Sequence, residues 1–290
     1  MEKNKKRINL SSDTSNAIEK QNSINRIINE NTPFDVIEAY KATRTNIMFS
    51  LNNEKGCKKI IISSATSGEG KSTTCINIAK TFAETGAKVL LMDADLRAPR
   101  VHKYLKITNE KGLSNVLAGF DTLDDCLVKN LSLNFDCLTS GALPPNPVEL
   151  ISSNSMQELM SELEERYDYI FIDTPPVTIV TEAVLLSKYA TGVIIVTRQK
   201  YTMFKLVDRA INSLKFADAR IIGFILNDAD DRYIYGSYKS GRTRRLSRTR
   251  YRYGRYGYYA ENSDRKKYVA AHASSQESEK QQPKNQEPKN

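Results

Sequence analysis

The sequence predicts an α/β fold, in which helices cover both faces of a parallel β-sheet. Short apolar segments, typical of strands buried on both faces, alternate along the chain with segments whose apolar residues recur at helical spacing. Hydrophobic residues make up 40% of the 290 residues, which is enough for one large domain with a full core. Stretches rich in polar residues at both ends predict tails that do not join this core.

The expected elements follow one another regularly. A helical segment at about 33–50 comes first. Helices are also expected at 70–85 and at 155–166, the second with a Ser-x-x-Glu capping box from Ser155 to Glu158. The expected strands are runs of mainly aliphatic residues: 58–64 (KKIIISS), 88–93 (KVLLMD), 134–138, 169–173 (YIFID), 192–197 (GVIIVT) and 220–226 (RIIGFIL).

Three parts are therefore expected along the chain. Residues 1–33 form a flexible segment, 34–231 a globular domain and 232–290 a disordered tail. The formal net charge of +9 belongs to this tail, because residues 232–268 carry 12 Lys or Arg against two acidic residues. The basicity thus requires an explanation that is specific to the tail.

Composition excludes several kinds of site. The only histidines are His102 and His272, so a zinc site or a histidine-based triad is disfavoured. The four cysteines show no CxxC pair and fit reduced thiols of a cytosolic protein. No apolar run reaches the 18 residues that a membrane helix needs, so we expect a cytoplasmic protein that meets the membrane through a partner.

A loop suited to phosphate binding follows the first expected strand. Residues 65–72 (ATSGEGKS) match the P-loop pattern G-x-x-x-x-G-K-[ST], except that an alanine replaces the first glycine. Gly68 and Gly70 allow backbone N–H groups to surround phosphate oxygens, and the following helix adds the positive end of its dipole. Lys71 is expected to reach the β- and γ-phosphates, and Ser72 to bind Mg²⁺. The fold is therefore expected to be P-loop NTPase-like.

Three aspartates stand at the ends of two apolar strands. Asp93 and Asp95 lie in LLMDAD, and Asp173 ends YIFID. Ligands of an open parallel sheet bind outside the carboxyl ends of the strands, so these carboxylates should converge on Lys71 and Ser72. Any one of them alone could merely end a strand or cap a helix. Their combination with a P-loop favours a phosphoryl-transfer site.

Phosphoryl transfer requires mainly positioning and charge neutralisation, because its transition state is loose. Lys71 and Mg²⁺ supply positive charge. Asp173 is expected to hold Mg²⁺ through water, with Asp95 and Ser72 also in the metal shell. Asp93 is expected to accept a proton from the attacking hydroxyl or to orient it, although the order of the two aspartates stays open. The residues expected to contact ATP in the loop and first helical turn are Ser67, Gly68, Glu69, Gly70, Lys71, Ser72 and Thr73.

These motifs resemble those of the bacterial tyrosine kinases of capsule and exopolysaccharide synthesis, the BY-kinases. Further matches are RAPRVH at 97–102, GLSNVL at 112–117 and SGALPPNPVEL at 140–150. The resemblance runs from about residue 38 to residue 227. It implies that 65–72 is the Walker A loop, that Asp93 and Asp95 belong to the second Walker motif (A′), that Asp173 is Walker B, and that Asn227 contacts the adenine.

The resemblance also implies partners. Glu38, Lys41 and Arg44 match the family's E-x-x-R-x-x-R motif, which builds a ring of kinases. Lysine replaces the usual first arginine and cannot form its bidentate contacts, so an ordinary surface helix is the alternative. Ser67 also departs from the family, which often has proline there. Separate kinases of this family need a transmembrane activator, which would recruit this chain to the inner face of the membrane.

The tail carries nine of the chain's 15 tyrosines among arginines, glycines and serines. One interpretation is an autophosphorylation tail that enters the site of a neighbouring subunit. Each phosphotyrosine adds about −1.5 to −2 charges, so roughly five to seven would cancel the local excess of basic residues. Other protein tyrosines and a cognate phosphatase are then also expected as partners. The phosphoacceptors expected are Tyr233, Tyr235, Tyr238, Tyr251, Tyr253, Tyr256, Tyr258 and Tyr259.

Other functions are possible for both parts. The tail also suits single-stranded nucleic acid or anionic lipid and polysaccharide, although a kinase-like core disfavours nucleic acid as the partner. The core also fits a positioning ATPase of the ParA/MinD type with a basic, surface-binding tail. That class carries a further lysine five residues before the P-loop lysine, where this chain has Thr66. A kinase is therefore favoured.

Overall fold

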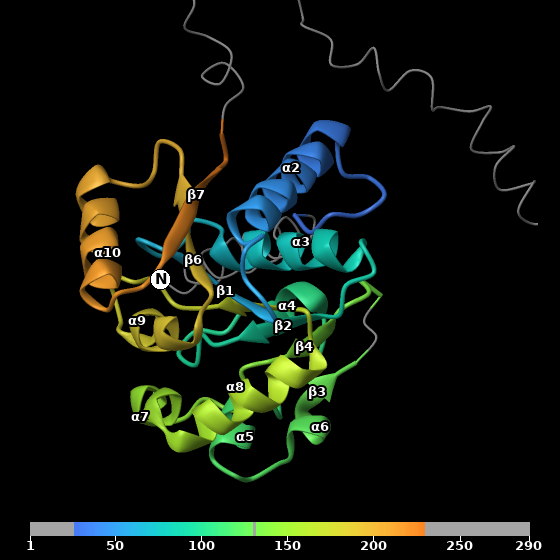
Figure 1. The fold of residues 1–290 in the computed structure, drawn as a ribbon, viewed down its shortest axis with the longest axis vertical. Coiled ribbons are helices and arrows are strands. Elements are labelled where there is room, and N and C mark those ends of the chain that lie inside the picture. Colours follow the sequence, from blue (N-terminus) through green and yellow to red (C-terminus); the bar gives the residue numbers. More distant parts are fainter. Residues whose placement is uncertain (1–25, 130–131, 230–290) are drawn as a thin grey trace, which may run out of the picture. The chain divides into compact units, whose positions relative to one another are not determined.

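A computed structural model describes residues 26–129 and 132–229. They form a seven-stranded sheet with the strand order β3-β4-β2-β5-β1-β6-β7 (Figure 1). All of the pairs are parallel except β3 with β4, which is antiparallel. The strands are β1 (Lys58–Ser64), β2 (Val89–Asp93), β3 (Leu127–Val128), β4 (Asp136–Leu138), β5 (Tyr169–Asp173), β6 (Gly192–Arg198) and β7 (Ile221–Asn227).

Helices connect the parallel strands, as expected for crossover connections. A 3-10 turn, η1 (Ser187–Tyr189), follows one of them. The α-helices are α2 (Phe34–Ser50), α3 (Lys71–Ala83), α4 (Val101–Leu105), α5 (Leu113–Leu117), α6 (Leu123–Cys126), α7 (Pro147–Ser152), α8 (Asn154–Arg166), α9 (Glu182–Leu186) and α10 (Phe204–Phe216).

Side chains of the central strands alternate between two buried faces, because successive residues of a strand point to opposite sides. On β1, Ile60 and Ile62 pack on one face and Ile61 on the other, and none of the three is exposed. Helices α2, α3 and α4 cover the first face, whereas α5 and α7 to α10 contribute to the second core (Figure 1). The middle residues of the central strands are therefore apolar on both faces, which explains why these strands were recognisable in the sequence.

The sequence placed the main strands correctly, with three corrections. The sheet is mixed, because the two-residue strand β3 pairs antiparallel with β4 and was too short to be recognised. The expected capping box of α8 is also wrong. Ser153 caps this helix, since its backbone is extended and its hydroxyl accepts a hydrogen bond from the N–H of Met156. Ser155 and Glu158 both lie inside the helix.

The third correction concerns the start of the folded domain, which we expected at residue 34. Ile27 and Ile28 are only 8% and 6% exposed, and Ile27 belongs to the core beneath α2 and α3. We call residues 26–33 the N-terminal strap. Residues 1–25 and the expected tail at 232–290 lie outside the described residues. None of the helices in the described ranges has the length and hydropathy to cross a bilayer.

The central aromatic packing yields a stability prediction. The ring of Phe82 on α3 lies 4.6 Å from that of Tyr169 and 5.0 Å from that of Phe171, centroid to centroid. Phe82→Ala should lower the free energy of unfolding by about 3–5 kcal/mol, because it leaves a cavity between helix and sheet. The matched change Phe120→Ala removes a side chain that is 80% exposed and should cost no more than about 0.5 kcal/mol. Urea unfolding compares the two variants, and equal losses would contradict this description of the core.

Candidate active site

The P-loop joins β1 to α3 at the carboxyl edge of the sheet. Gly68 and Gly70 have φ values of 82° and 88°, in the left-handed region that glycine adopts without strain. At Gly70 a Cβ atom would also lie 2.1 Å from the side-chain nitrogen of Asn227. The 13-residue helix α3 begins at Lys71, so its N-terminal N–H groups and the positive end of its dipole adjoin the loop.

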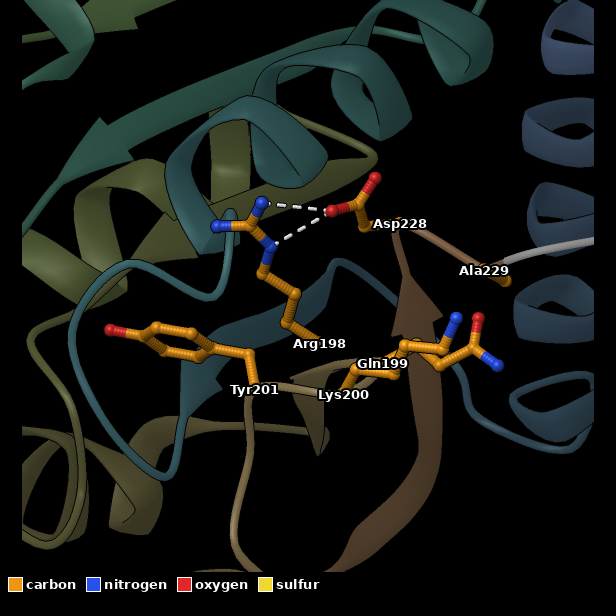
Figure 2. Close-up of a pocket in the computed structure, with 6 residues that line it drawn as sticks. All are labelled: Arg198, Gln199, Lys200, Tyr201, Asp228 and Ala229. Carbon is orange, nitrogen blue, oxygen red and sulfur yellow. Dashed lines mark hydrogen bonds and ion pairs between the residues drawn. The ribbon is translucent and has the colours of Figure 1, made fainter.

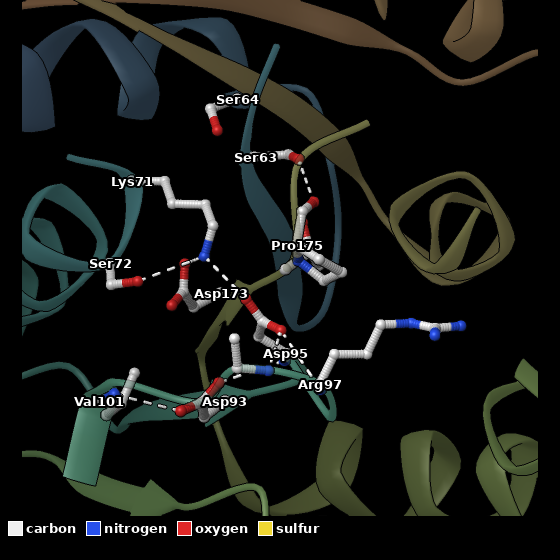
Figure 3. Close-up of polar contacts among 12 residues, drawn as sticks. Ser63, Ser64, Lys71, Ser72, Asp93, Asp95, Arg97, Val101, Asp173 and Pro175 are labelled. Carbon is white, nitrogen blue, oxygen red and sulfur yellow. Dashed lines mark hydrogen bonds and ion pairs between the residues drawn. The ribbon is translucent and has the colours of Figure 1, made fainter. Parts of the chain in front are cut away.

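Lys71 points to the carboxylates that follow β2 and β5 (Figure 3). Its Nζ lies 3.2 Å from Oδ2 of Asp95, 3.6 Å from Oδ1 of Asp173 and 3.4 Å from Oγ of Ser72. Burial lowers the pKa of Lys71, but Asp173, Asp95 and Asp93 more than offset this effect, so the pKa lies above its ordinary value. The neighbouring carboxylates therefore favour the charged form of this buried lysine.

Asp93 lies opposite Asp173 in the register of β2 and β5, and neither residue is exposed. Its two carboxylate oxygens accept hydrogen bonds from the backbone N–H groups of Asp95 and Val101, both at 3.2 Å (Figure 3). Burial and the neighbouring charge of Asp173 raise the pKa of Asp93 to about 8. The proton affinity of this carboxyl group is thus much higher than that of an exposed aspartate.

Asp173 has the least satisfied carboxylate of the site. Among the described residues, neither of its buried oxygens has a hydrogen-bond partner. Burial raises the pKa of Asp173, and Lys71 opposes this increase. A buried carboxylate beside the hydroxyl of Ser72, whose oxygens have only the 3.6 Å ion pair with Lys71 in the described part of the chain, fits a hard cation such as Mg²⁺, which takes oxygen ligands and keeps several water molecules. No cluster of three acidic, histidine or cysteine ligands occurs in the described ranges, so such an ion would depend on other oxygens as well.

Glu69 holds the P-loop from within. Its carboxylate accepts a hydrogen bond from the N–H of Thr66 at 2.8 Å and one from the hydroxyl of Thr202 in the loop after β6. Asn227 at the end of β7 donates its side-chain N–H to the carbonyl of Glu69 at 2.9 Å. The side chain of Glu69 is therefore structural, and Asn227 lies directly against the loop.

A second set of contacts joins the outer side of the P-loop to β6 and β7. Arg198 donates two hydrogen bonds to one carboxylate oxygen of Asp228, at 3.0 and 2.8 Å (Figure 2). It also donates to the carbonyl of Gly68 at 3.5 Å. Tyr201 donates its hydroxyl hydrogen to the carbonyl of Ser67 at 3.0 Å. We call Arg198, Tyr201, Thr202, Asn227 and Asp228 the P-loop latch.

The latch shows which functional residues sequence reasoning missed. Of its members only Asn227 was expected near the nucleotide, and the others carry no recognisable motif. A further unexpected pair is Arg97 with Glu182, whose Nε and Oε1 atoms lie 2.5 Å apart at the same edge of the sheet. Glu182 is fully buried and retains one unpartnered oxygen among the described residues.

The residues expected to build a ring lie on α2, away from the carboxylates. Nζ of Lys41 and Oε1 of Glu38 form an ion pair at 2.9 Å, and Arg44 donates a hydrogen bond to the carbonyl of Thr81 on α3 at 2.6 Å. Within one chain, Arg44 thus also attaches α2 to α3. The eight expected phosphoacceptor tyrosines lie outside the described residues.

Comparisons with known proteins agree with this geometry. The model of an AAA domain family matches residues 57–221. The chain is 40% identical over 190 residues to the tyrosine-protein kinase YwqD of Bacillus subtilis, which covers 66% of this chain and 80% of that protein. This chain belongs to the bacterial tyrosine kinases. The resemblance expected from the motifs is therefore confirmed.

Solved structures extend the match within the bacterial tyrosine kinases. The kinase domain of the Escherichia coli tyrosine kinase ETK superposes with a TM-score of 0.65 at 30% identity, covering 73% of this chain and 80% of that one. The chimerical protein CapA2B2 gives a TM-score of 0.64 at 34% identity, covering 69% and 86%. The tyrosine-protein kinase wzc of Salmonella typhi is 32% identical over 191 residues, but this chain covers only 26% of that longer protein.

The P-loop geometry predicts a sharp difference between two glycines. Gly70→Ala should weaken binding of ATP, the ligand expected for this loop, at least about tenfold, since the new methyl group collides with Asn227 and the backbone is strained. Gly86 has nearly the same φ, 86°, but nothing lies within 4 Å of its potential Cβ. Gly86→Ala should therefore cost stability, by about 1 kcal/mol, and leave ATP affinity unchanged. Calorimetric titration of both variants measures this, and equal affinities would contradict the geometry.

Proposed function

We propose that this chain is an Mg-ATP-dependent protein-tyrosine kinase that phosphorylates tyrosines of its own tail. The observation that carries the proposal is the position of Lys71 between the P-loop and three buried carboxylates, in a chain of the bacterial tyrosine kinase family. Other proteins with accessible tyrosines are further substrates. The products are ADP and a phosphotyrosine ester.

The P-loop binds the phosphates of ATP in this proposal. Backbone N–H groups of residues 67–73 point at phosphate oxygens, and the N-terminus of α3 favours their negative charge. Lys71 compensates the charge of the γ-phosphoryl group as it leaves ADP. Latch residues hold the backbone of the loop, because Asn227 donates to the carbonyl of Glu69 and Thr202 donates to the carboxylate of Glu69, which in turn binds the N–H of Thr66.

Mg²⁺ is the expected metal. When the phosphates of ATP bind beside the three carboxylates, the single positive charge of Lys71 does not balance their negative charge. A divalent cation is therefore needed. Ser72 and Asp173 would hold it, with Asp95 in its outer shell. When bound, the ion neutralises charge on the β- and γ-phosphates.

Asp93 is proposed to accept the proton of the attacking phenol. A general base works best when its pKa is near the working pH, and the pKa of Asp93 is raised to about 8 by burial and by Asp173. Asp95 is assigned another role, because its Oδ2 forms an ion pair with Nζ of Lys71 at 3.2 Å. Asp95 instead orients Lys71.

The tail is proposed as the acceptor on the basis of its tyrosine content and its link to the kinase domain. β7 ends at Asn227, and the tyrosine-rich segment starts six residues later. Successive phosphorylation removes the positive charge of the tail. A cognate tyrosine phosphatase would restore it, so that charge becomes the regulated property.

Polysaccharide synthesis at the membrane is the proposed setting. The resemblance to capsule and exopolysaccharide kinases supports regulation of polymer assembly and export. A transmembrane activator would recruit this chain to the inner face of the membrane. Glu38, Lys41 and Arg44 would join copies of the chain into a ring, in which the tail of one copy reaches the site of the next.

A positioning ATPase is the alternative to a kinase. The site-determining protein MinD of Pyrococcus horikoshii, complexed with Mg-ADP, superposes with a TM-score of 0.51 at 29% identity. Thr66 argues against this alternative, because the lysine that such ATPases place there is missing. The greater similarity to tyrosine kinases supports the same conclusion.

Loss of the central cation tests the proposed phosphate site. Lys71→Met should abolish autophosphorylation, since the γ-phosphoryl group loses its main protein cation while the side-chain volume is kept. Lys55→Met is the matched control at an exposed lysine and should label like the unmodified chain. Incorporation of labelled phosphate measures both. Undiminished labelling of Lys71→Met would refute the site.

Variants of the two aspartates of the A′ motif should differ in which kinetic property they change. Asp93→Asn should lower kcat by about 10²–10⁴-fold with little change in ATP affinity, because the proton acceptor is lost. Asp95→Asn should instead raise the Mg²⁺ concentration needed for half-maximal activity. Kinetics at varied ATP and Mg²⁺ distinguish these effects. A large change in Mg²⁺ requirement for Asp93→Asn alone would reverse the two assignments.

A further inference from the structure

A pocket next to the P-loop has one wall made by the N-terminal strap. Its volume is about 630 Å³, within the range of small-molecule sites. Gly68, Gly70 and Thr73 line one end, and the latch residue Asn227 lies beside them. At the other end lie strap residues, including Arg26 and Asn31, and Tyr40 of α2.

The position of the phosphates limits what this pocket can hold. The P-loop glycines and the first turn of α3 form its phosphate end, so the part of ATP that extends into it is the nucleoside. The lining suits such a ligand, because Asn31 offers an amide group and Arg26 a guanidinium group, while Pro33, Val36 and Tyr40 offer apolar and aromatic surface. A purine needs both, since its edge forms hydrogen bonds and its faces are apolar.

The strap is held to the P-loop helix by buried polar contacts. Asn77 of α3 is 0% exposed, accepts a hydrogen bond from the N–H of Ile28 at 2.9 Å and donates one to the carbonyl of Arg26 at 3.0 Å. Lys80, one turn further along α3, donates to the carbonyl of Ile28 at 2.7 Å. Two backbone groups of the strap thus replace water around a buried amide, which fixes the path of the strap.

A tight turn then directs the strap across the pocket. The N–H of Thr32 donates to the carbonyl of Asn29 at 3.0 Å, and the N–H of Asn31 donates to the side-chain oxygen of Asn29 at 2.9 Å. The N–H of Asn29 in turn donates a hydrogen bond to Oγ1 of Thr32. The turn leads into α2 at Phe34, and Arg26 and Asn31 line the pocket while Glu30 between them does not.

We propose that the strap is the nucleoside-binding element of this kinase, with Arg26 and Asn31 contacting the base or ribose of ATP and Asn77 holding the strap in place. The inference rests on the proposed function, because it takes the P-loop as the phosphate site. It adds a specificity element to that site from a segment that precedes the kinase motifs. Affinity for the phosphates depends on the P-loop alone, whereas affinity for the nucleoside depends on the strap.

The test compares a ligand that has a nucleoside with one that lacks it. Binding of Mg-ADP and of Mg-pyrophosphate to the full chain is measured by calorimetry. The double variant Arg26→Ala/Asn31→Ala should bind ADP about tenfold more weakly, since it loses polar contacts to the nucleoside, and should bind pyrophosphate like the unmodified chain. Both positions are exposed, so the variant is expected to fold. Glu30→Ala is the matched control and should change neither affinity.

A second variant addresses the support of the strap. Asn77→Ala should show the same selective loss of ADP affinity. Circular dichroism checks that this variant keeps its fold. If the fold is lost, the double variant Arg26→Ala/Asn31→Ala alone decides. Unchanged ADP affinity in the double variant would overturn the inference. Equal weakening of ADP and pyrophosphate would overturn it as well, since the strap would then act through the P-loop. Failure of the unmodified chain to bind pyrophosphate or ADP would instead refute the proposed phosphate site, and the inference with it.

Discussion

The site depends on keeping one ammonium group charged in a nearly closed space. The side chain of Lys71 is only 12% exposed, so without partners its burial would favour the neutral form. Asp173, Asp95 and Asp93 reverse this preference. The carboxylates in turn are buried close to one another and need the cation, since removing either side leaves uncompensated charge inside the protein. Lys71 and the carboxylates therefore each require the other nearby. The P-loop and the ends of β2 and β5 must bring them within ion-pair distance.

The fold provides that position from two directions. Parallel pairing of β2 with β5 sets Asp93 opposite Asp173, and the turn after β1 places Lys71 within ion-pair distance of Asp173 and Asp95. On the far side, the latch fixes the P-loop backbone through Glu69 and Asn227. A loop held at both sides reorganises little when phosphates arrive, and such preorganisation is the main source of electrostatic catalysis.

The meeting of Lys71 with the aspartates at one edge of the sheet was predictable from the sequence, whereas the surroundings of these residues were not. Lys71 belongs to the P-loop pattern after β1, and the three aspartates stand at or just after the ends of the apolar strands β2 and β5, so both signals can be recognised locally. The latch depends on β6 and β7 being neighbours beside β1, which no local pattern reveals. The strap depends on Asn77, which in the sequence is one polar residue in a helix. Ser153 and Ser155 fit the helix-start pattern almost equally, and only the backbone conformation distinguishes them.

The central claim is that this arrangement delivers the γ-phosphoryl group to a phenol and not to water. The most direct measurement is the partition of label from γ-labelled ATP between phosphotyrosine and inorganic phosphate. The chain is used after purification from cells that also express the proposed transmembrane activator. The account predicts that most of the transferred label is found on tyrosines after residue 231. Rapid release of inorganic phosphate without label on tyrosine would contradict it and favour a positioning ATPase.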